Sequence, residues 1–155
     1  MPGAVWLRSR PPRRAHGTLT RERVAVEAVT LLDRGGPAGL SLRRLAEVLA
    51  VHPTTLYWHV AGRDELLDLA LDSVFSEISL PDRHRADWID DVRAFMHELR
   101  HTLLRHPWSA ALISSRPLLG PQALARSEFV YAALVSGGFT GDDLAAAAAS
   151  ITNLV

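Results

Sequence analysis

The 155-residue sequence contains no cysteine. This absence excludes disulfides, iron–sulfur clusters, thiolate zinc sites and cysteine nucleophiles. The sequence also lacks a run of about 18 apolar residues, which a membrane span requires. Its arginine-rich start is not followed by the apolar stretch of a signal peptide. We therefore expect a cytoplasmic protein with no membrane segment.

Lysine is absent too, so all 17 basic side chains are arginine, and 17 acidic side chains balance them. The charges are distributed unevenly. Residues 1–63 hold ten arginines and four acidic residues, a net charge of +6, so the remainder carries −6. This asymmetry predicts a basic module that binds a polyanion, followed by an acidic module with another role.

Residues 1–19 combine prolines, glycines and four arginines without apolar periodicity, which predicts a flexible basic arm. Such an arm can simply increase solubility, or it can lie along the minor groove of DNA. The composition leaves both roles open.

Beyond residue 19, apolar residues recur at helical spacing and no segment shows strand alternation. This pattern predicts an all-α fold. Thr20 and Ser41 are the expected N-caps of the first two helices, and Pro53 is expected to begin the third. We expect helices over residues 21–34, 42–49, 53–60, 63–79, 86–105, 108–114 and 122–135, and from 142 onward.

The helices expected at 42–49 and 53–60 have the spacing of a helix-turn-helix, within a three-helix DNA-binding domain over residues 20–65. The second helix of such a motif enters the major groove, so its outer face needs polar or aromatic groups. Leu56 and Val60 supply the expected inner face. The four bulky residues 56–59 cannot all face inward on one helix, so their aromatic side chains are not simply core. The outer face comprises Thr54, Thr55, Tyr57, Trp58 and His59.

Residues 45–69, LAEVLAVHPTTLYWHVAGRDELLDL, resemble the DNA-binding motif of the TetR family of bacterial transcriptional repressors. Residues 106–121, HPWSAALISSRPLLGP, resemble the regulatory domain of its tetracycline-repressor-like branch. The resemblance implies that Arg43 reads guanine and that Arg63 grips phosphate. This chain has Ala50 where the family often has glycine in the turn. The expected DNA-binding residues are Arg43, Arg44, Thr54, Thr55, Tyr57, Trp58, His59 and Arg63.

The resemblance also implies that residues 66–155 form a helical regulatory domain, which binds a small-molecule effector and forms a homodimer. The positions that would grip tetracycline hold Ser79, Phe95 and Glu128, so we expect a different effector. For the apolar candidates, ordinary core packing remains the alternative. The expected effector-binding residues are Phe95, Leu99, Leu112, Arg116 and Phe129.

The chain ends inside what should be the first dimer-forming helix, so the resemblance implies a C-terminally truncated regulatory domain. An isologous dimer would place its two reading helices in successive major grooves, about 34 Å apart.

His97, Glu98 and His101 satisfy the H-E-x-x-H pattern, in which two histidines bind zinc and the glutamate polarises water. The extended pattern fails, because position 104 is leucine and position 107 is proline. Glu128 is a possible third ligand without further support. We expect a surface or pocket pair of histidines, with no metal site, no cofactor and no enzymatic activity.

The sequence thus predicts a ligand-responsive transcriptional regulator, most simply a repressor. It would bind a pseudo-palindromic DNA operator as a dimer and be released by a small molecule. Two alternatives remain open, a metal-dependent hydrolase that uses the histidine pair and a DNA-independent interaction module.

Overall fold

The computed structural model describes residues 2–6 and 19–153. In this part of the chain every regular element is helical, which confirms the expected all-α class. The elements are η1 (Ala4–Trp6), α1 (Arg21–Gly35), η2 (Pro37–Gly39), α2 (Leu42–Val48), α3 (Pro53–Leu56), α4 (Arg63–Phe75), α5 (Trp88–Arg105), α6 (Pro107–Ile113), α7 (Pro121–Ser136) and α8 (Gly141–Asn153).

Side-chain caps begin the first two α-helices where the sequence predicts them. Thr20 Oγ1 accepts a hydrogen bond from the Arg23 N–H at 3.1 Å. Ser41 Oγ accepts one from the Arg44 N–H, also at 3.1 Å. Each bond satisfies one of the amide groups that a helix leaves unpaired in its first turn.

Two helices are shorter than expected. The third was expected to reach residue 60 but α3 ends at Leu56, and the connecting helix was expected to reach residue 79 but α4 ends at Phe75. In both cases the backbone tightens into turns that join residues three apart. His59 N–H binds the Leu56 carbonyl and Ile78 N–H binds that of Phe75. Apolar periodicity continues through such turns, so it overestimates helix length.

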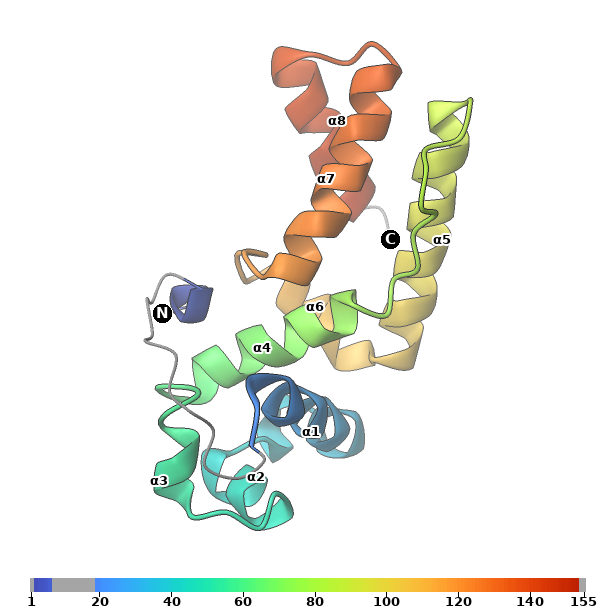
Figure 1. Cartoon of the computed structure of the whole chain (residues 1–155). Helices are drawn as coiled ribbons and strands as arrows, with labels where there is room; N and C mark the ends of the chain where they lie inside the picture. Colours follow the sequence, from blue (N-terminus) through green and yellow to red (C-terminus); the bar gives the residue numbers. More distant parts are fainter. Residues whose placement is uncertain (1, 7–18, 154–155) are drawn as a thin grey trace.

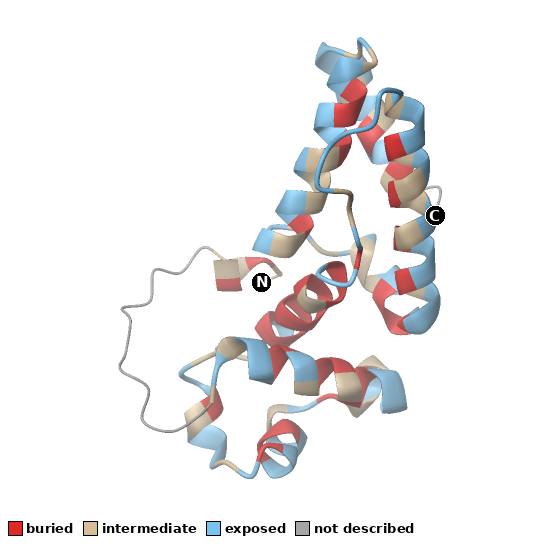
Figure 2. Ribbon diagram, turned by 45° about the vertical axis from the view of Figure 1, so that its right-hand side comes forward, coloured by how far each residue is buried: buried red, intermediate tan, exposed pale blue. Residues whose placement is uncertain are grey.

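α4 is the central element of the fold. α1, α2 and α3 lie at one end of the molecule, α5, α7 and α8 lie at the other, and α4 runs between them (Figure 1). Ten of its 13 residues are buried, and its ribbon is almost entirely red in Figure 2. Leu66 and Leu67 belong to the core shared with α1–α3, whereas Leu71 and Phe75 belong to the core of the second half. Residues on every side of α4 are therefore covered by other parts of the chain.

Three carboxylates recur every four residues on this buried helix: Asp64, Asp68 and Asp72. The first two bind one guanidinium, that of Arg116 in the loop between α6 and α7. Arg116 Nη2 lies 2.8 Å from Asp64 Oδ1, and its Nη1 lies 2.8 Å from Asp68 Oδ1. The hydrogen bond from Arg116 holds the pKa of Asp64 below its ordinary value. Asp68 is buried, so this pairing offsets the cost of removing its charge from water.

Asp72 caps α7 from outside. Its Oδ1 accepts the N–H of Ala123 in the first turn of α7 at 2.9 Å. Gly120 lies so close to this carboxylate that a Cβ atom at Gly120 would collide with it. Burial raises the pKa of Asp72. A raised pKa favours the folded state below the ordinary value of 3.8, and this contribution is lost as the pH rises through the raised pKa.

The start of the chain departs from the expected flexible arm. Residues Ala4–Trp6 form a 3-10 turn, and Val5 is only 2% exposed within the core shared by α1 and α4. The Gly3 N–H donates a hydrogen bond to Asp68 Oδ2 at 2.6 Å. Composition missed this docking because three apolar residues are too few to show periodicity. Residues 7–18, which carry the four arginines of the expected arm, lie outside the described residues.

His106, between α5 and α6, joins three other parts of the chain. Its Nδ1 lies 2.8 Å from Asp33 Oδ1 of α1, and its Nε2 lies 3.2 Å from Glu77 just beyond α4. Trp108 Nε1 donates to the same Asp33 oxygen at 2.7 Å. This cluster attaches the far end of α1 to the second half of the molecule.

Ala50 in the turn between α2 and α3 has a φ of 52°, where an L-residue other than glycine is strained. We expect Ala50→Gly to stabilise the protein by about 1 kcal/mol, because glycine adopts this conformation without the Cβ clash. Ala125→Gly, at an exposed site inside α7, should destabilise it by about 1 kcal/mol. Urea unfolding of both variants tests this, and an equal loss of stability in both would contradict it.

Arg116→Gln should cost about 3 kcal/mol of folding free energy, because it leaves the buried Asp68 carboxylate without its cationic partner. Arg93→Gln is the control, since Arg93 forms an exposed pair with Asp90 and should change stability by less than about 1 kcal/mol. Thermal and urea unfolding measure both. Equal small effects would show that the Arg116 pairs contribute little.

Candidate DNA-binding surface and effector cavity

The turn region that follows α3 separates apolar from aromatic side chains as the sequence predicts. Leu56 and Val60 are completely buried, whereas Tyr57 is 55% exposed and Trp58 is 63% exposed. Two large aromatic side chains on a surface cost solvation free energy without stabilising the fold. Their exposure therefore indicates a binding surface.

Polar groups of α3 lie beside these aromatics. Thr54 is exposed, while Thr55 and His59 are half-buried. Sequence reasoning missed His52, an exposed residue whose Nδ1 caps α3 by accepting the Thr54 N–H at 3.4 Å. Its position as the residue before Pro53 could have marked it, since proline commonly follows an N-cap.

The expected basic residues differ in their surroundings. Arg43 is 87% exposed, and its Nε donates to Glu47 at 3.2 Å within α2. Arg44 is also exposed. An exposed pair of this kind is weak, so Arg43 can exchange its partner for another acceptor. Arg63 instead donates to the backbone carbonyls of Leu40 and Pro37, which ties the start of α4 to the segment after α1.

A cavity of about 170 Å³ lies at the other end of the molecule, between α5, α7, α8 and the end of α4. Its walls are largely aliphatic and aromatic, as is usual for small-molecule sites. Leu118 from the α6–α7 loop also contributes to the wall. The lining residues are Phe75, Phe95, Leu99, Leu118, Arg126, Ser127, Val130, Tyr131, Ala145, Ala148, Ala149 and Thr152.

Arg126 is the positively charged residue among those that line the cavity. Its Nη1 donates to Gln122 Oε1 at 2.8 Å, and its Nη2 donates to the carbonyls of Ser76 and Ile78. Among the described residues, its buried Nε has no hydrogen-bond acceptor. The Asp72 carboxylate interacts with this charge electrostatically, while the hydrogen bonds of the guanidinium go to neutral acceptors. Tyr131, 42% exposed, adds a hydroxyl at the same wall.

Two of the five expected effector-binding residues, Phe95 and Leu99, line the cavity. The other three lie elsewhere. Leu112 packs between the two cores, and Arg116 is held by the carboxylates of α4. Phe129 stacks on His84, with ring centroids 4.4 Å apart. The missed lining residues come in equal numbers from α7 and α8, with Phe75 of α4 and Leu118 besides. The alanine run of α8 carries no sequence pattern that distinguishes a cavity wall from a helix surface.

The H-E-x-x-H motif lies on the outer face of α5, where His97 and His101 are exposed. Glu128, the suggested third ligand, is exposed on α7. Within residues 2–6 and 19–153, no group of three histidine, aspartate or glutamate side chains could hold a metal ion. None of the helices described there is long and apolar enough to cross a membrane.

Comparison with known proteins connects these features to a family. Residues 80–155 match the model of the tetracyclin repressor-like, C-terminal domain. An HTH-type transcriptional regulator of Saccharopolyspora erythraea is 54% identical over 99% of this chain, and the HTH-type transcriptional repressor DrrR1 of Streptomyces coeruleorubidus is 37% identical over 94% of it. The chain spans 65% and 54% of the lengths of these two relatives.

Solved structures show the same arrangement. Apo ActR from Streptomyces coelicolor superimposes with a TM-score of 0.82 at 34% identity, covering 90% of this chain and 67% of ActR. ActR in complex with actinorhodin gives a TM-score of 0.80 at the same identity, with coverages of 89% and 66%. BioQ with its double-stranded DNA operator gives 0.73 at 29% identity, with coverages of 88% and 86%. The chain therefore belongs to the TetR family of DNA-binding transcriptional regulators and not to an enzyme family.

Proposed function

We propose that this protein is a ligand-responsive repressor, which binds a pseudo-palindromic operator as a homodimer and leaves it when a small molecule occupies the cavity. One observation carries the proposal: two features adjoin the same buried helix, α4. The helix-turn-helix domain, which presents an exposed aromatic surface, shares a core with α4, and the largely apolar cavity is lined by Phe75 at the end of α4. Such a regulator would act at the chromosome, in the cytoplasm.

At the operator, Tyr57, Trp58 and the threonines of α3 would face the major groove. Arg43 would exchange Glu47 for a guanine, whose two acceptors match its planar fork. Arg44 and Arg63 would approach phosphates, with Arg63 retaining its bonds to backbone carbonyls through its other donors. BioQ, of similar fold, has been crystallised with its operator, which supports this mode of binding.

We expect Arg43→Ala to weaken specific DNA binding about 10- to 100-fold, because it removes a bidentate base contact. Tyr57→Ala should weaken it as well, without unfolding the protein, because Tyr57 is exposed. Fluorescence anisotropy with DNA from upstream of the protein's own gene, across a salt series, measures both.

Arg93→Ala is the control, since it removes an exposed, ion-paired arginine from α5 at the other end of the molecule. It should bind DNA as the unaltered protein does. Weak binding to every DNA sequence, unchanged in all three variants, would contradict specific recognition and favour the DNA-independent alternative.

The cavity favours a molecule that is largely apolar and aromatic and carries hydrogen-bond acceptors. Phe75, Phe95 and Val130 offer flat or aliphatic contact surfaces. Arg126 and Tyr131 supply donors at one wall, and an acceptor there could bind the Arg126 Nε, which has no hydrogen-bond partner among the described residues. ActR, which shares this fold, has been crystallised with actinorhodin, which makes aromatic compounds of that type suitable first probes.

Ala149→Phe should weaken the binding of actinorhodin by at least about tenfold, because the added ring fills space that the ligand needs. Ala146→Phe is the control, since Ala146 is exposed on the same helix and does not line the cavity. Calorimetric titration of both variants, with anisotropy to confirm unaltered DNA binding, tests the site. Equal actinorhodin binding by both would place the effector elsewhere.

A further inference from the structure

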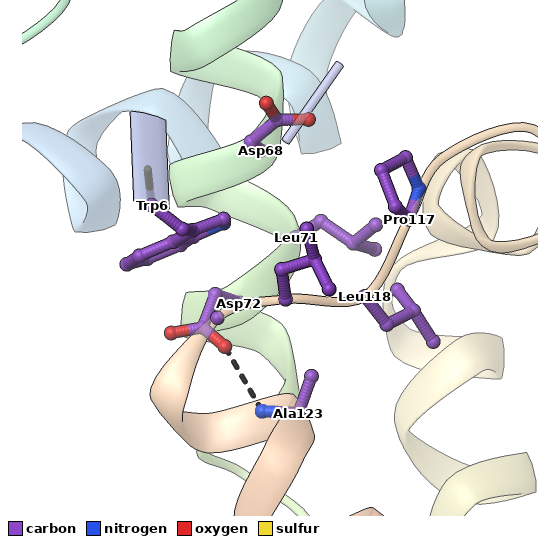
Figure 3. A pocket seen from close by; sticks show the side chains of 9 residues that line it. Trp6, Asp68, Leu71, Asp72, Pro117, Leu118 and Ala123 are labelled. Atoms are coloured by element: carbon purple, nitrogen blue, oxygen red, sulfur yellow. Dashed lines mark hydrogen bonds between the residues drawn. The ribbon is translucent and has the colours of Figure 1, made fainter. Parts of the chain in front are cut away.

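The N-terminal segment, residues 2–6, bridges three parts of the molecule. Figure 3 shows Trp6 beside Asp68 and Asp72 of α4, with Pro117 and Leu118 of the α6–α7 loop nearby. On α4, Asp68 accepts the Gly3 N–H in a buried hydrogen bond of 2.6 Å.

The second attachment is to α1, in the DNA-binding half. Arg21 Nη2 donates to the Val5 carbonyl at 3.1 Å, and the same guanidinium lies 5.4 Å from the centre of the Trp6 ring. A cation above an aromatic face is attracted to it, so one arginine holds both residues. Val5 fills the core between α1 and α4, where it is 2% exposed.

The third attachment is to the loop before α7. Gly3 has a φ of 78°, and a Cβ atom at this residue would lie 2.8 Å from Pro117 Cγ and 3.3 Å from Leu119 Cδ1. Leu118, between these two residues, lines the cavity. Asp68 binds the segment through Oδ2 and the loop's Arg116 through Oδ1. One buried carboxylate thus fastens both the segment and the loop to α4.

We propose that residues 2–6 are a strap, which holds the α6–α7 loop against α4 and so raises the effector concentration needed to release DNA. The regulatory half of this proposal rests on the proposed function. An effector that moves Leu118 must displace the neighbouring Pro117 and Leu119 from Gly3. It must also distort the bonds by which Asp68 holds Gly3 and Arg116. The strap thereby stabilises the conformation without effector.

Hydrogen exchange tests the mechanical half without any effector. Gly3→Ala should speed exchange of the Leu119 and Ala123 amides about tenfold, because a Cβ atom separates the segment from Pro117. Gly138→Ala is matched, since Gly138 also has a positive φ, 89°, but open space around its Cβ position. It should leave these amides unchanged. Unchanged exchange in Gly3→Ala, and in a variant lacking residues 2–6, would overturn the strap.

DNA release tests the regulatory half. The probe is actinorhodin, and the DNA is labelled DNA from upstream of the protein's own gene. Gly3→Ala and the variant lacking residues 2–6 should both release this DNA at about tenfold lower actinorhodin concentration than the unaltered protein and Gly138→Ala. Equal midpoints despite faster exchange would overturn the regulatory role. If the unaltered protein neither binds actinorhodin nor releases DNA with it, the proposed effector fails, while the exchange comparison still decides the strap.

Discussion

The structure depends on keeping a helix that carries buried carboxylates inside the fold. Asp68 and Asp72 are buried on α4, which separates the two cores of the molecule, and Asp64 lies exposed at its start. An ionised carboxylate in such a place is costly unless charged or amide donors surround it. The donors come from segments distant in sequence: the N-terminal residues, the α6–α7 loop and the first turn of α7. Satisfying the charges of α4 therefore fixes where these segments lie.

This arrangement links the two functional ends of the protein. The helix-turn-helix packs against the first half of α4, and the cavity lies at its second half. The loop that binds Asp68 contributes Leu118 to the cavity, and α7, which Asp72 caps, contributes Arg126 and Val130. Packed interiors deform little, so under the proposed function a change in cavity shape would be transferred to α4 rather than absorbed locally. The proposed ligand response uses contacts that are also required for folding.

Several features reduce stability and are explained better by binding than by folding. Tyr57 and Trp58 expose large aromatic surfaces, and Ala50 adopts a left-handed backbone where glycine would be relaxed. Arg126 has a buried Nε without a hydrogen-bond acceptor among the described residues, next to the cavity. Functional surfaces commonly contain such local costs, which the well-packed remainder of the domain offsets.

Local sequence determined the helical class, the capped starts at Thr20 and Ser41, and which of residues 56–60 face inward or outward. These features depend on spacing and on backbone chemistry within a few residues, which is why periodicity and caps predict them. Tertiary structure alone decided the burial of α4, the roles of Asp68 and Arg116, the docking of Val5 and the cavity wall on α8. These features depend on tertiary partners, and for Asp68 the partners are far away in sequence: Gly3 is 65 residues away and Arg116 is 48 residues away. No local pattern encodes which charged side chain will meet its partner inside the fold.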